Sequence, residues 1–314
     1  MKILVIGAAG MIGQKLLPHL KGNAVVAHDV VAPQVLPGVK AVVSDLSVPG
    51  EAEKLLYHRP ELIFHLAAIV SGEAEADFDK GYRINLDGTR HLFDAIRRIG
   101  DGYRPRVVFT SSIAVFGAPF PPAIGDDFFH TPLTSYGTQK AIGELLLSDY
   151  SRRGFFDGIG IRLPTICVRP GKPNRAASGF FSGIIREPLA GQEAILPVEE
   201  GVRHWHASPR AAVGFLIHAS KINSELLGAR RNLSMPGVSV TVGEQIAALR
   251  KVAGDKVAAL IRHKPDPVIM KIVEGWPRNF DPRRALELGF RADDSFEQII
   301  RIHIEDEHGV RSSP

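Results

Sequence analysis

The sequence predicts an α/β fold in which a doubly wound parallel sheet is followed by a smaller C-terminal α/β domain. Short apolar runs alternate with amphipathic segments through the first half of the chain, which is typical of a parallel sheet. The first run, Lys2 to Ile6, leads directly into a glycine-rich turn and a helical segment. A length of 314 residues is enough for one large core and a second, smaller one.

Composition argues against several classes of protein. The formal charge is only +4 and no aromatic-interleaved block of Lys and Arg is present, so we expect no nucleic-acid partner. No apolar run is long enough to cross a bilayer and no basic leader precedes the first strand, so we expect neither membrane insertion nor secretion. Cys167 is the single cysteine, which excludes an internal disulfide and predicts a cytoplasmic protein.

Three glycines, Gly7, Gly10 and Gly13, follow the first strand at intervals of three residues. Glycine lets the backbone turn sharply and approach a ligand, and the first amides of the next helix have no intrahelical partners. The turn therefore predicts a pyrophosphate site. The same spacing also fits an ordinary buried strand followed by a glycine-rich loop.

The second predicted strand, 24–28, ends at Asp29. In a dinucleotide-binding sheet an acid at this position accepts hydrogen bonds from the ribose hydroxyls and repels a 2′-phosphate. No Arg or Lys occurs among residues 30–33. The sequence therefore favours NAD over NADP.

The remaining elements of the first half continue the same alternation. Further strands are predicted at 41–43, 62–65, 106–109 and 158–163, with helices at 51–57, 77–99 and 141–150. The strand at 106–109 ends in Thr110-Ser111-Ser112, at the edge where such sheets bind substrates. The irregular segment 117–132, rich in Pro, Gly and Phe, is long enough to be a functional flap.

Tyr136 and Lys140 are four residues apart, so on a helix they share one face. A free tyrosine ionises near pH ~10, and a neighbouring ammonium favours the phenolate. The pair predicts a tyrosine base that is activated by the lysine. Without the preceding glycine turn and hydroxyl cluster, it would be read equally well as two surface residues.

These motifs, in this order, resemble the extended short-chain dehydrogenase/reductase family, also called the NAD-dependent epimerase/dehydratase family. The resemblance implies a Rossmann-type sheet that binds NAD and a catalytic set of Ser112, with Ser111 beside it, Tyr136 and Lys140. It also implies homodimers formed by the two long helices, 77–99 and 136–150. The residues that carry the resemblance are Gly7, Gly10, Gly13, Ala67, Ala68, Asn85, Ser111, Ser112, Tyr136 and Lys140.

The resemblance further implies which residues contact the cofactor. They are Gly7, Gly10, Met11, Ile12, Gly13, Asp29, Asp45, Leu46, Ala67, Ala68, Asn85, Tyr136, Lys140, Leu163 and Pro164.

The second half departs from the members that act on nucleotide sugars. Thr165 stands where those members carry Asn, and their Arg-x-x-x-x-x-Asp-Asp pattern is replaced over residues 203–210. The segments 162–171, 178–186 and 203–206 instead resemble members that oxidise the C2 hydroxyl of a four-carbon sugar acid with NAD. We therefore expect a sugar acid as the small-molecule substrate.

A sugar-acid carboxylate needs a cationic clamp, for which the planar fork of arginine is well suited. Arg203 is the first candidate and Arg175 the second, while Ser71, Ser112 and Thr165 are the other predicted substrate contacts. His204 and His206 share one face of a predicted strand, but no carboxylate or cysteine with suitable spacing lies nearby, so no metal site is predicted.

The predicted domains follow from these assignments. Residues 1–164 form the NAD-binding domain and 206–232 return to it, whereas 165–205 and 233–305 form the substrate domain and 306–314 a flexible tail.

Two other functions fit the sequence. One is a different enzyme on the same scaffold: a nucleotide-sugar epimerase or dehydratase, or an amino-acid dehydrogenase of the threonine type, whose hydroxyl segment resembles residues 111–114. The other is a non-catalytic NAD-sensing protein, against which the intact Tyr136 and Lys140 pair argues, because a sensor needs no base.

Overall fold

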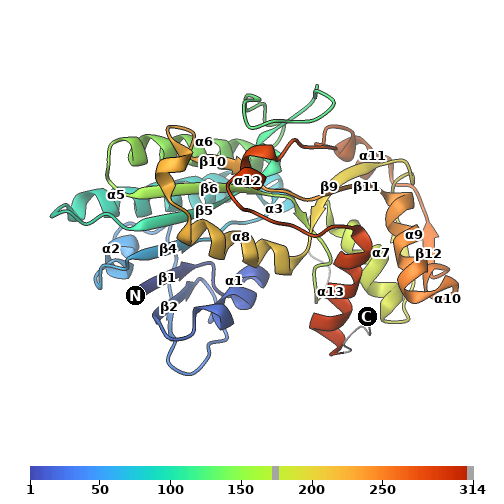
Figure 1. Cartoon of the computed structure of the whole chain (residues 1–314), viewed down its shortest axis with the longest axis horizontal. Coiled ribbons are helices and arrows are strands. Elements are labelled where there is room, and N and C mark those ends of the chain that lie inside the picture. Colours follow the sequence, from blue (N-terminus) through green and yellow to red (C-terminus); the bar gives the residue numbers. More distant parts are fainter. Residues whose placement is uncertain (172–176, 310–314) are drawn as a thin grey trace.

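The larger lobe of the molecule is built on a seven-stranded sheet (Figure 1). The computed structural model describes residues 1–171 and 177–309. Within them the strand order is β10-β6-β5-β4-β1-β2-β3, and each neighbouring pair is parallel. The order reverses between β1 and β4, which is where this architecture binds ligands. The strands are β1 (Lys2–Ile6), β2 (Ala24–Asp29), β3 (Lys40–Val43), β4 (Leu62–His65), β5 (Arg106–Ser112), β6 (Asp157–Leu163) and β10 (Asn232–Ser234).

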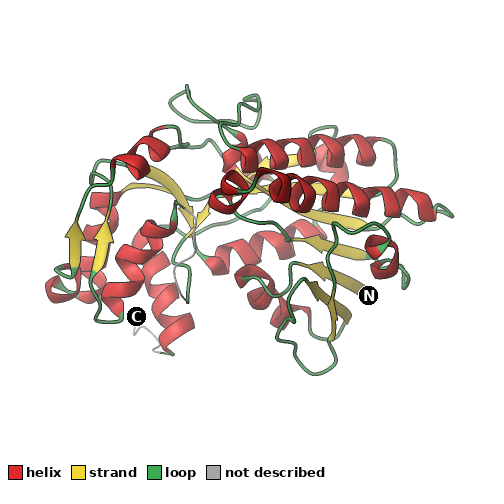
Figure 2. Ribbon diagram, turned by 180° about the vertical axis from the view of Figure 1, so that it is seen from behind, coloured by secondary structure: helices red, strands yellow, loops and turns green. Residues whose placement is uncertain are grey.

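Helices cover both faces of this sheet, so its strands are apolar on both sides. Ile3 and Val5 of β1 belong to a core shared with α1 (Met11–Leu16) and α8 (Pro209–Lys221). Leu4 and Ile6 face the opposite core. That core is closed by α2 (Glu51–Leu55), α5 (Gly88–Ile99) and α6 (Ser135–Arg152). Figure 2 shows the long helices α5 and α6 lying side by side across their face of the sheet.

The predicted helix at 77–99 is divided into three segments. Asp77 caps α4 (Phe78–Gly81) by accepting a hydrogen bond from the Lys80 amide, and a π-helical segment, η2 (Tyr82–Asp87), separates α4 from α5. π-Helical segments are often found at functional sites. Here the segment carries the buried residue Asn85.

The smaller lobe contains two small sheets, ordered β11-β9-β7 and β12-β8. Phe181, Ile185, Leu249 and Ile299 lie in its core. Its elements are β7 (Thr165–Ile166), α7 (Gly179–Leu189), β8 (Ala194–Leu196), β9 (Arg203–Ala207), β11 (Val238–Thr241), α9 (Val242–Ala253), α10 (Asp255–Ala258), β12 (Ile261–His263), α11 (Pro267–Glu274) and α13 (Phe296–His308). The remaining short elements are η1 (Leu17–Leu20), α3 (Ser71–Ala76), η3 (Ile113–Val115), η4 (Ser224–Leu227) and α12 (Arg283–Glu287).

The chain passes back to the large lobe after β9. Helix α8 packs beside α1, and β10 extends the large sheet beyond β6. A second return, which the sequence does not predict, brings Ala285 and Phe290 into the same core.

The C-terminal helix extends further than the sequence predicts. Helix α13 continues to His308, beyond the predicted start of the tail at residue 306. Glu307 pairs with Lys15 at 2.7 Å and Asp306 pairs with Arg210 at 2.5 Å, and these contacts hold the last turn against the large lobe. Residues 310–314 of the predicted tail lie outside the described residues. No helix among the described residues is long and apolar enough to cross a membrane.

Candidate active site

The glycine turn after β1 brings two backbone segments into close contact. Gly7 has φ +88°, and a Cβ on it would lie 2.5 Å from the Ala67 amide nitrogen. A Cβ on Gly13 would lie 2.4 Å from the Gly7 carbonyl oxygen. Only glycine avoids both conflicts. The turn therefore has the close-packed form that lets a backbone approach a pyrophosphate.

Asp29, at the end of β2, fastens this turn. Its Oδ2 accepts a hydrogen bond from the Ala9 amide at 2.9 Å, and its Oδ1 accepts one from the Val30 amide at 2.7 Å. Oδ1 also accepts a hydrogen bond from the Val31 amide at 3.5 Å. Oδ2 has a further lone pair, which suits a ribose hydroxyl donor. The turn and Asp29 together fit NAD, with the dinucleotide's phosphates at the glycines and a ribose at Asp29.

A cavity of about 510 Å³ runs from the glycine turn to the small lobe. Its volume lies within the range of small-molecule sites. The predicted site residues that line it are Gly7, Gly10, Met11, Ile12, Gly13, Ala68, Ser71, Ser111, Ser112, Tyr136, Lys140, Leu163, Pro164 and Thr165. The other predicted site residues that the structure describes are not part of its lining: Asp29, Asp45, Leu46, Ala67, Asn85 and Arg203. Arg175 lies outside the described residues.

Tyr136 and Ser112 meet in this cavity. Thr134 caps the start of α6 by accepting a hydrogen bond from the Gly137 amide at 3.0 Å, which places Tyr136 in the first turn. Burial raises the pKa of the Tyr136 phenol above its usual value, while hydrogen bonding to Ser112 and the positive charge of Arg169 lower it. Ser112 and Arg169 are therefore the groups that favour the phenolate.

Lys140 is buried one helical turn after Tyr136, with 3% of its surface exposed. Its Nζ donates to the Thr110 carbonyl at 2.8 Å and lies 5.8 Å from the centre of the Tyr136 ring. Burial lowers the pKa of Lys140 to about 8, against the opposing effect of Glu144. Arg169 is a second cation of the cavity, and its charge lowers the pKa of Tyr136. The activation of Tyr136 by Lys140 stays a prediction.

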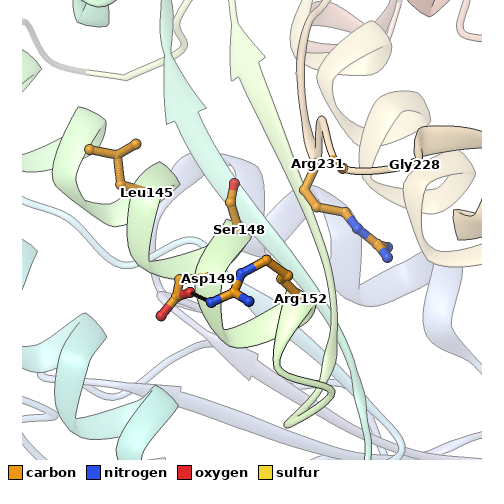
Figure 3. Close-up of a pocket in the computed structure, with 7 residues that line it drawn as sticks. Leu145, Ser148, Asp149, Arg152, Gly228 and Arg231 are labelled. Atoms are coloured by element: carbon orange, nitrogen blue, oxygen red, sulfur yellow. Dashed lines mark hydrogen bonds and ion pairs between the residues drawn. The ribbon is translucent and has the colours of Figure 1, made fainter.

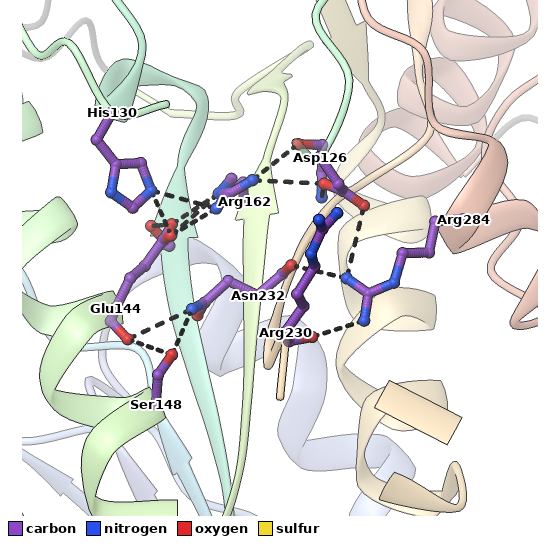
Figure 4. Close-up of polar contacts among 10 residues, drawn as sticks. Asp126, His130, Glu144, Ser148, Arg162, Arg230, Asn232 and Arg284 are labelled. Atoms are coloured by element: carbon purple, nitrogen blue, oxygen red, sulfur yellow. Dashed lines mark hydrogen bonds and ion pairs between the residues drawn. The ribbon is translucent and has the colours of Figure 1, made fainter. Parts of the chain in front are cut away.

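Ser111 donates a hydrogen bond to a buried charge network. Figure 4 shows Glu144, His130, Arg162 and Asp126 of this network. The Ser111 hydroxyl donates to Glu144 Oε1 at 2.5 Å. Glu144 also accepts hydrogen bonds from Arg162 Nη2 at 2.8 Å and pairs with His130 Nε2 at 2.9 Å. On the other side Arg162 pairs with Asp126 of the 117–132 loop at 3.4 Å. Ser111 is therefore bound to the charge network, whereas Ser112 is the hydroxyl that hydrogen-bonds with Tyr136.

Asn85 is buried and fully engaged by protein groups. Its Nδ2 donates to Gln139 Oε1 at 2.7 Å and to the Ile69 carbonyl at 3.1 Å, and its Oδ1 accepts from the Ile69 amide at 2.9 Å. Asn85 thus holds the segment after β4 against α6, and its contact with the cofactor stays a prediction.

His204 fixes the orientation of Thr165 on the small-lobe side of the cavity. Its Nδ1 donates to the Pro277 carbonyl at 2.8 Å, so its Nε2 accepts the hydrogen bond from the Thr165 hydroxyl at 2.7 Å. Burial lowers the pKa of His204 to about 4, and the ring is neutral at pH 7. The hydroxyl oxygen of Thr165 keeps its lone pairs for a donor in the cavity.

Arg203 lies on the opposite face of β9 from His204. Its Nη1 donates to the Ser239 carbonyl at 2.9 Å and its Nη2 pairs with Glu244 at 3.2 Å. The structure therefore does not bring Arg203, the first candidate for the carboxylate clamp, to the cavity. The cavity is lined instead by Arg169 and Arg186, neither of which the sequence singled out.

The structure offers little support for a second site elsewhere. A smaller hollow of about 370 Å³ lies between α6 and the 228–231 segment (Figure 3), but its Arg152 pairs with Asp149 at 2.6 Å and its Arg231 with Asp157 at 3.0 Å. Its charges are thus satisfied within the protein. Among the described residues, no group of His, Cys, Asp and Glu is arranged to hold a metal ion.

Comparison with known proteins decides the family. Residues 3–213 match the model of the NAD dependent epimerase/dehydratase family. The chain belongs to this family. The resemblance, the Rossmann-type fold and NAD as cofactor, all predicted from the sequence, are confirmed.

Individual relatives cover nearly the whole chain. It is 48% identical over 321 residues to D-erythronate dehydrogenase of Cupriavidus necator, covering 98% of each chain. It is 42% identical to D-erythronate dehydrogenase of Haemophilus influenzae, covering 97% of this chain and 99% of the relative. A crystal structure described as a nucleoside-diphosphate-sugar epimerase from Agrobacterium tumefaciens superposes with a TM-score of 0.96 at 67% identity, covering 98% of this chain and 95% of that one.

Proposed function

We propose that this protein oxidises the C2 hydroxyl of the four-carbon sugar acid D-erythronate with NAD. The observation that carries the proposal is the near full-length identity to two D-erythronate dehydrogenases. The charge of the cavity supports it. Lys140, Arg169 and Arg186 line the cavity, and no Asp or Glu does so among the described residues. Such a cavity favours an anionic substrate.

In the proposed mechanism, Tyr136 acts as the base. Its phenolate takes the proton of the C2 hydroxyl, and Ser112 donates a hydrogen bond to the reacting oxygen as charge develops on it. The alcohol loses that proton and a hydride from C2 and becomes a ketone. NAD, when bound, supplies the hydride acceptor. Gly7, Gly13 and Asp29 would hold it at the large lobe, with Lys140 at the end nearest the base.

The reaction is tested by following NADH absorbance with purified protein. The substrate panel contains D-erythronate, other C4 to C6 sugar acids, L-threonine and UDP-sugars. We expect NADH to accumulate with D-erythronate. Tyr136→Phe should abolish this turnover while leaving NADH binding near normal, because the ring stays and only the base is lost. Retained turnover in this variant would refute the assigned base.

A nucleotide-sugar epimerase is the second candidate, favoured by the description of the related Agrobacterium structure. An epimerase regenerates its NAD and releases no net NADH. Conversion of a UDP-sugar without NADH accumulation, together with no oxidation of sugar acids, would replace our proposal.

We also propose that residues 1–164, α8 and β10 form the NAD-binding domain. We further propose that the protein is cytoplasmic and forms a homodimer through α5 and α6. In support, Leu145 of α6 is 62% exposed, and a partner helix that covered it would remove apolar surface from water. Light scattering should give twice the chain mass. Leu145→Glu should lower that mass at micromolar concentration, whereas a monomeric wild type would refute the dimer.

A further inference from the structure

Among the residues that the structure describes, Arg169 is a cation without an anionic partner. It follows β7 and lines the cavity. Its Nε donates to the Ile166 carbonyl at 3.2 Å and its Nη2 to the Ser178 hydroxyl at 3.2 Å, while its Nη1 has no partner among the described residues. No described carboxylate forms an ion pair with it, and residues 172–176 contain no Asp or Glu.

Arg186, the neighbouring arginine of the cavity, differs in this respect. Its Nη2 pairs with Glu187 at 2.5 Å, and its Nη1 donates to the Arg169 carbonyl at 2.7 Å. Arg186 is thus neutralised and helps to hold the backbone that carries Arg169. Burial lowers the pKa of Arg169, which shows that its charge is poorly solvated. A poorly solvated, unpaired charge is costly unless a ligand supplies the opposite charge.

The position of Arg169 relative to the base limits what that ligand is. Arg169 and Tyr136 line the same cavity. The charge of Arg169 also lowers the pKa of Tyr136. In a 2-hydroxy acid the carboxylate carbon is bonded directly to the carbon that is oxidised. In a nucleotide sugar oxidised on its ring, the diphosphate is several bonds away from that carbon. A cation beside the base therefore matches a carboxylate next to the reacting carbon.

We propose that Arg169 binds the substrate carboxylate through its guanidinium fork and thereby restricts oxidation to the adjacent C2 carbon. This inference rests on the proposed function and names the residue that selects its substrate class. Ser178 and the Ile166 carbonyl hold the fork in place, as a rigid two-point contact requires. Thr165, oriented by His204, is then left to accept a hydrogen bond from a hydroxyl further along the substrate.

The test compares D-erythronate with its neutral amide, D-erythronamide, in wild type, Arg169→Met and Arg169→Lys. Losing one partner of a desolvated charge pair is expected to lower kcat/KM for the acid about 100-fold or more in Arg169→Met. Arg169→Lys should lower it roughly 10-fold, because the charge stays and the fork is lost. Turnover of the amide should change by less than about threefold, since it has no charge to bind.

Arg203→Met is the matched control, because Arg203 lies outside the cavity and pairs with Glu244. Its kcat/KM for acid and amide should both stay within about twofold of the wild-type values, as expected for an exposed ion pair. NADH binding and thermal melting check that each variant is folded. If Arg169→Met fails to fold, Arg169→Lys still tests whether kcat/KM falls for the acid and not for the amide.

The outcomes separate the two proposals. Suppose that the wild type oxidises D-erythronate. If the Arg169 variants then lose kcat/KM equally for acid and amide, or lose it for neither, the clamp is overturned and the proposed reaction stands. Wild type that oxidises no sugar acid overturns the proposed function. In that case calorimetric titration of the NADH-loaded protein with D-erythronate decides the clamp: binding by wild type that Arg169→Met loses supports it, and absence of binding by wild type overturns it.

Discussion

Replacing Glu144 with leucine tests the buried charge network beneath the active site. Glu144 is fully buried and its two carboxylate oxygens serve Ser111, His130 and Arg162. Without Glu144, Asp126 at 3.4 Å is the one acidic partner of the 5% exposed Arg162 in the described part of the chain. Breaking a buried ion pair from one side costs about 3–5 kcal/mol, because the remaining charge is uncompensated.

This loss is large enough to measure by denaturation. At about 2–4 °C per kcal/mol for a chain of more than 150 residues, Glu144→Leu should lower Tm by roughly 6–20 °C. Circular dichroism melts give Tm, and urea titrations give the free energy of unfolding. Glu193→Leu is the control, because Glu193 pairs with Arg262 at the surface, where both side chains are more than half exposed. It should cost less than about 1 kcal/mol.

A double-mutant cycle with Arg162→Met completes this prediction. Removing both partners eliminates the uncompensated charge, so the double variant should be more stable than the sum of the single losses predicts, by about 2 kcal/mol or more. Additive losses, or a loss below about 1 kcal/mol for Glu144→Leu, would refute the reasoning.

Three further predictions concern the cofactor turn and acid stability. Asp29→Ala should raise KM for NAD about tenfold and narrow its preference over NADP; an unchanged NAD/NADP ratio of kcat/KM contradicts this. Gly13→Ala should weaken NADH binding at least tenfold, because its Cβ would lie 2.4 Å from a backbone carbonyl oxygen. Its control is Gly214→Ala in α8, where the space around the glycine is open. This control should raise the free energy of unfolding by up to ~1 kcal/mol. The pKa of His204 is about 4 in the folded protein and ~6.5 unfolded, so its stabilising contribution is complete above pH 6.5 and is lost as pH falls to 4. His204→Gln should therefore lose about 3 kcal/mol less than wild type over that range in urea titrations, and an identical loss would contradict the assignment.

Local sequence patterns predicted the features that depend on neighbouring residues. The glycine spacing predicted the close turn at Gly7, because no other residue type tolerates its backbone geometry and contacts. The four-residue interval predicted that Tyr136 and Lys140 share one face of a helix, and on α6 both side chains line the same cavity. In both cases the chemistry and the geometry lie within one or two turns of the chain.

The features that were missed depend on which way a side chain faces in the folded protein. Ser111 and Ser112 are adjacent on β5, and strand alternation turns one to Glu144 and the other to Tyr136. The same alternation on β9 turns Arg203 away from the cavity. Arg169 is recognisable only after folding, because its lack of an acidic partner is a property of the tertiary structure. An acid one turn after Lys140, at Glu144, was the available signal for the buried network.

The return of the chain to the large sheet means that residues 1–164 alone cannot complete the large lobe. Strand β10 and helix α8 complete a sheet whose other strands all precede residue 164. A nascent or truncated chain ending there would leave the β6 edge unpaired and expose the apolar surface that α8 covers. Unpaired edges and exposed apolar faces promote aggregation. The nucleotide-binding half therefore cannot be excised at the lobe boundary without exposing the edge and the face that β10 and α8 cover.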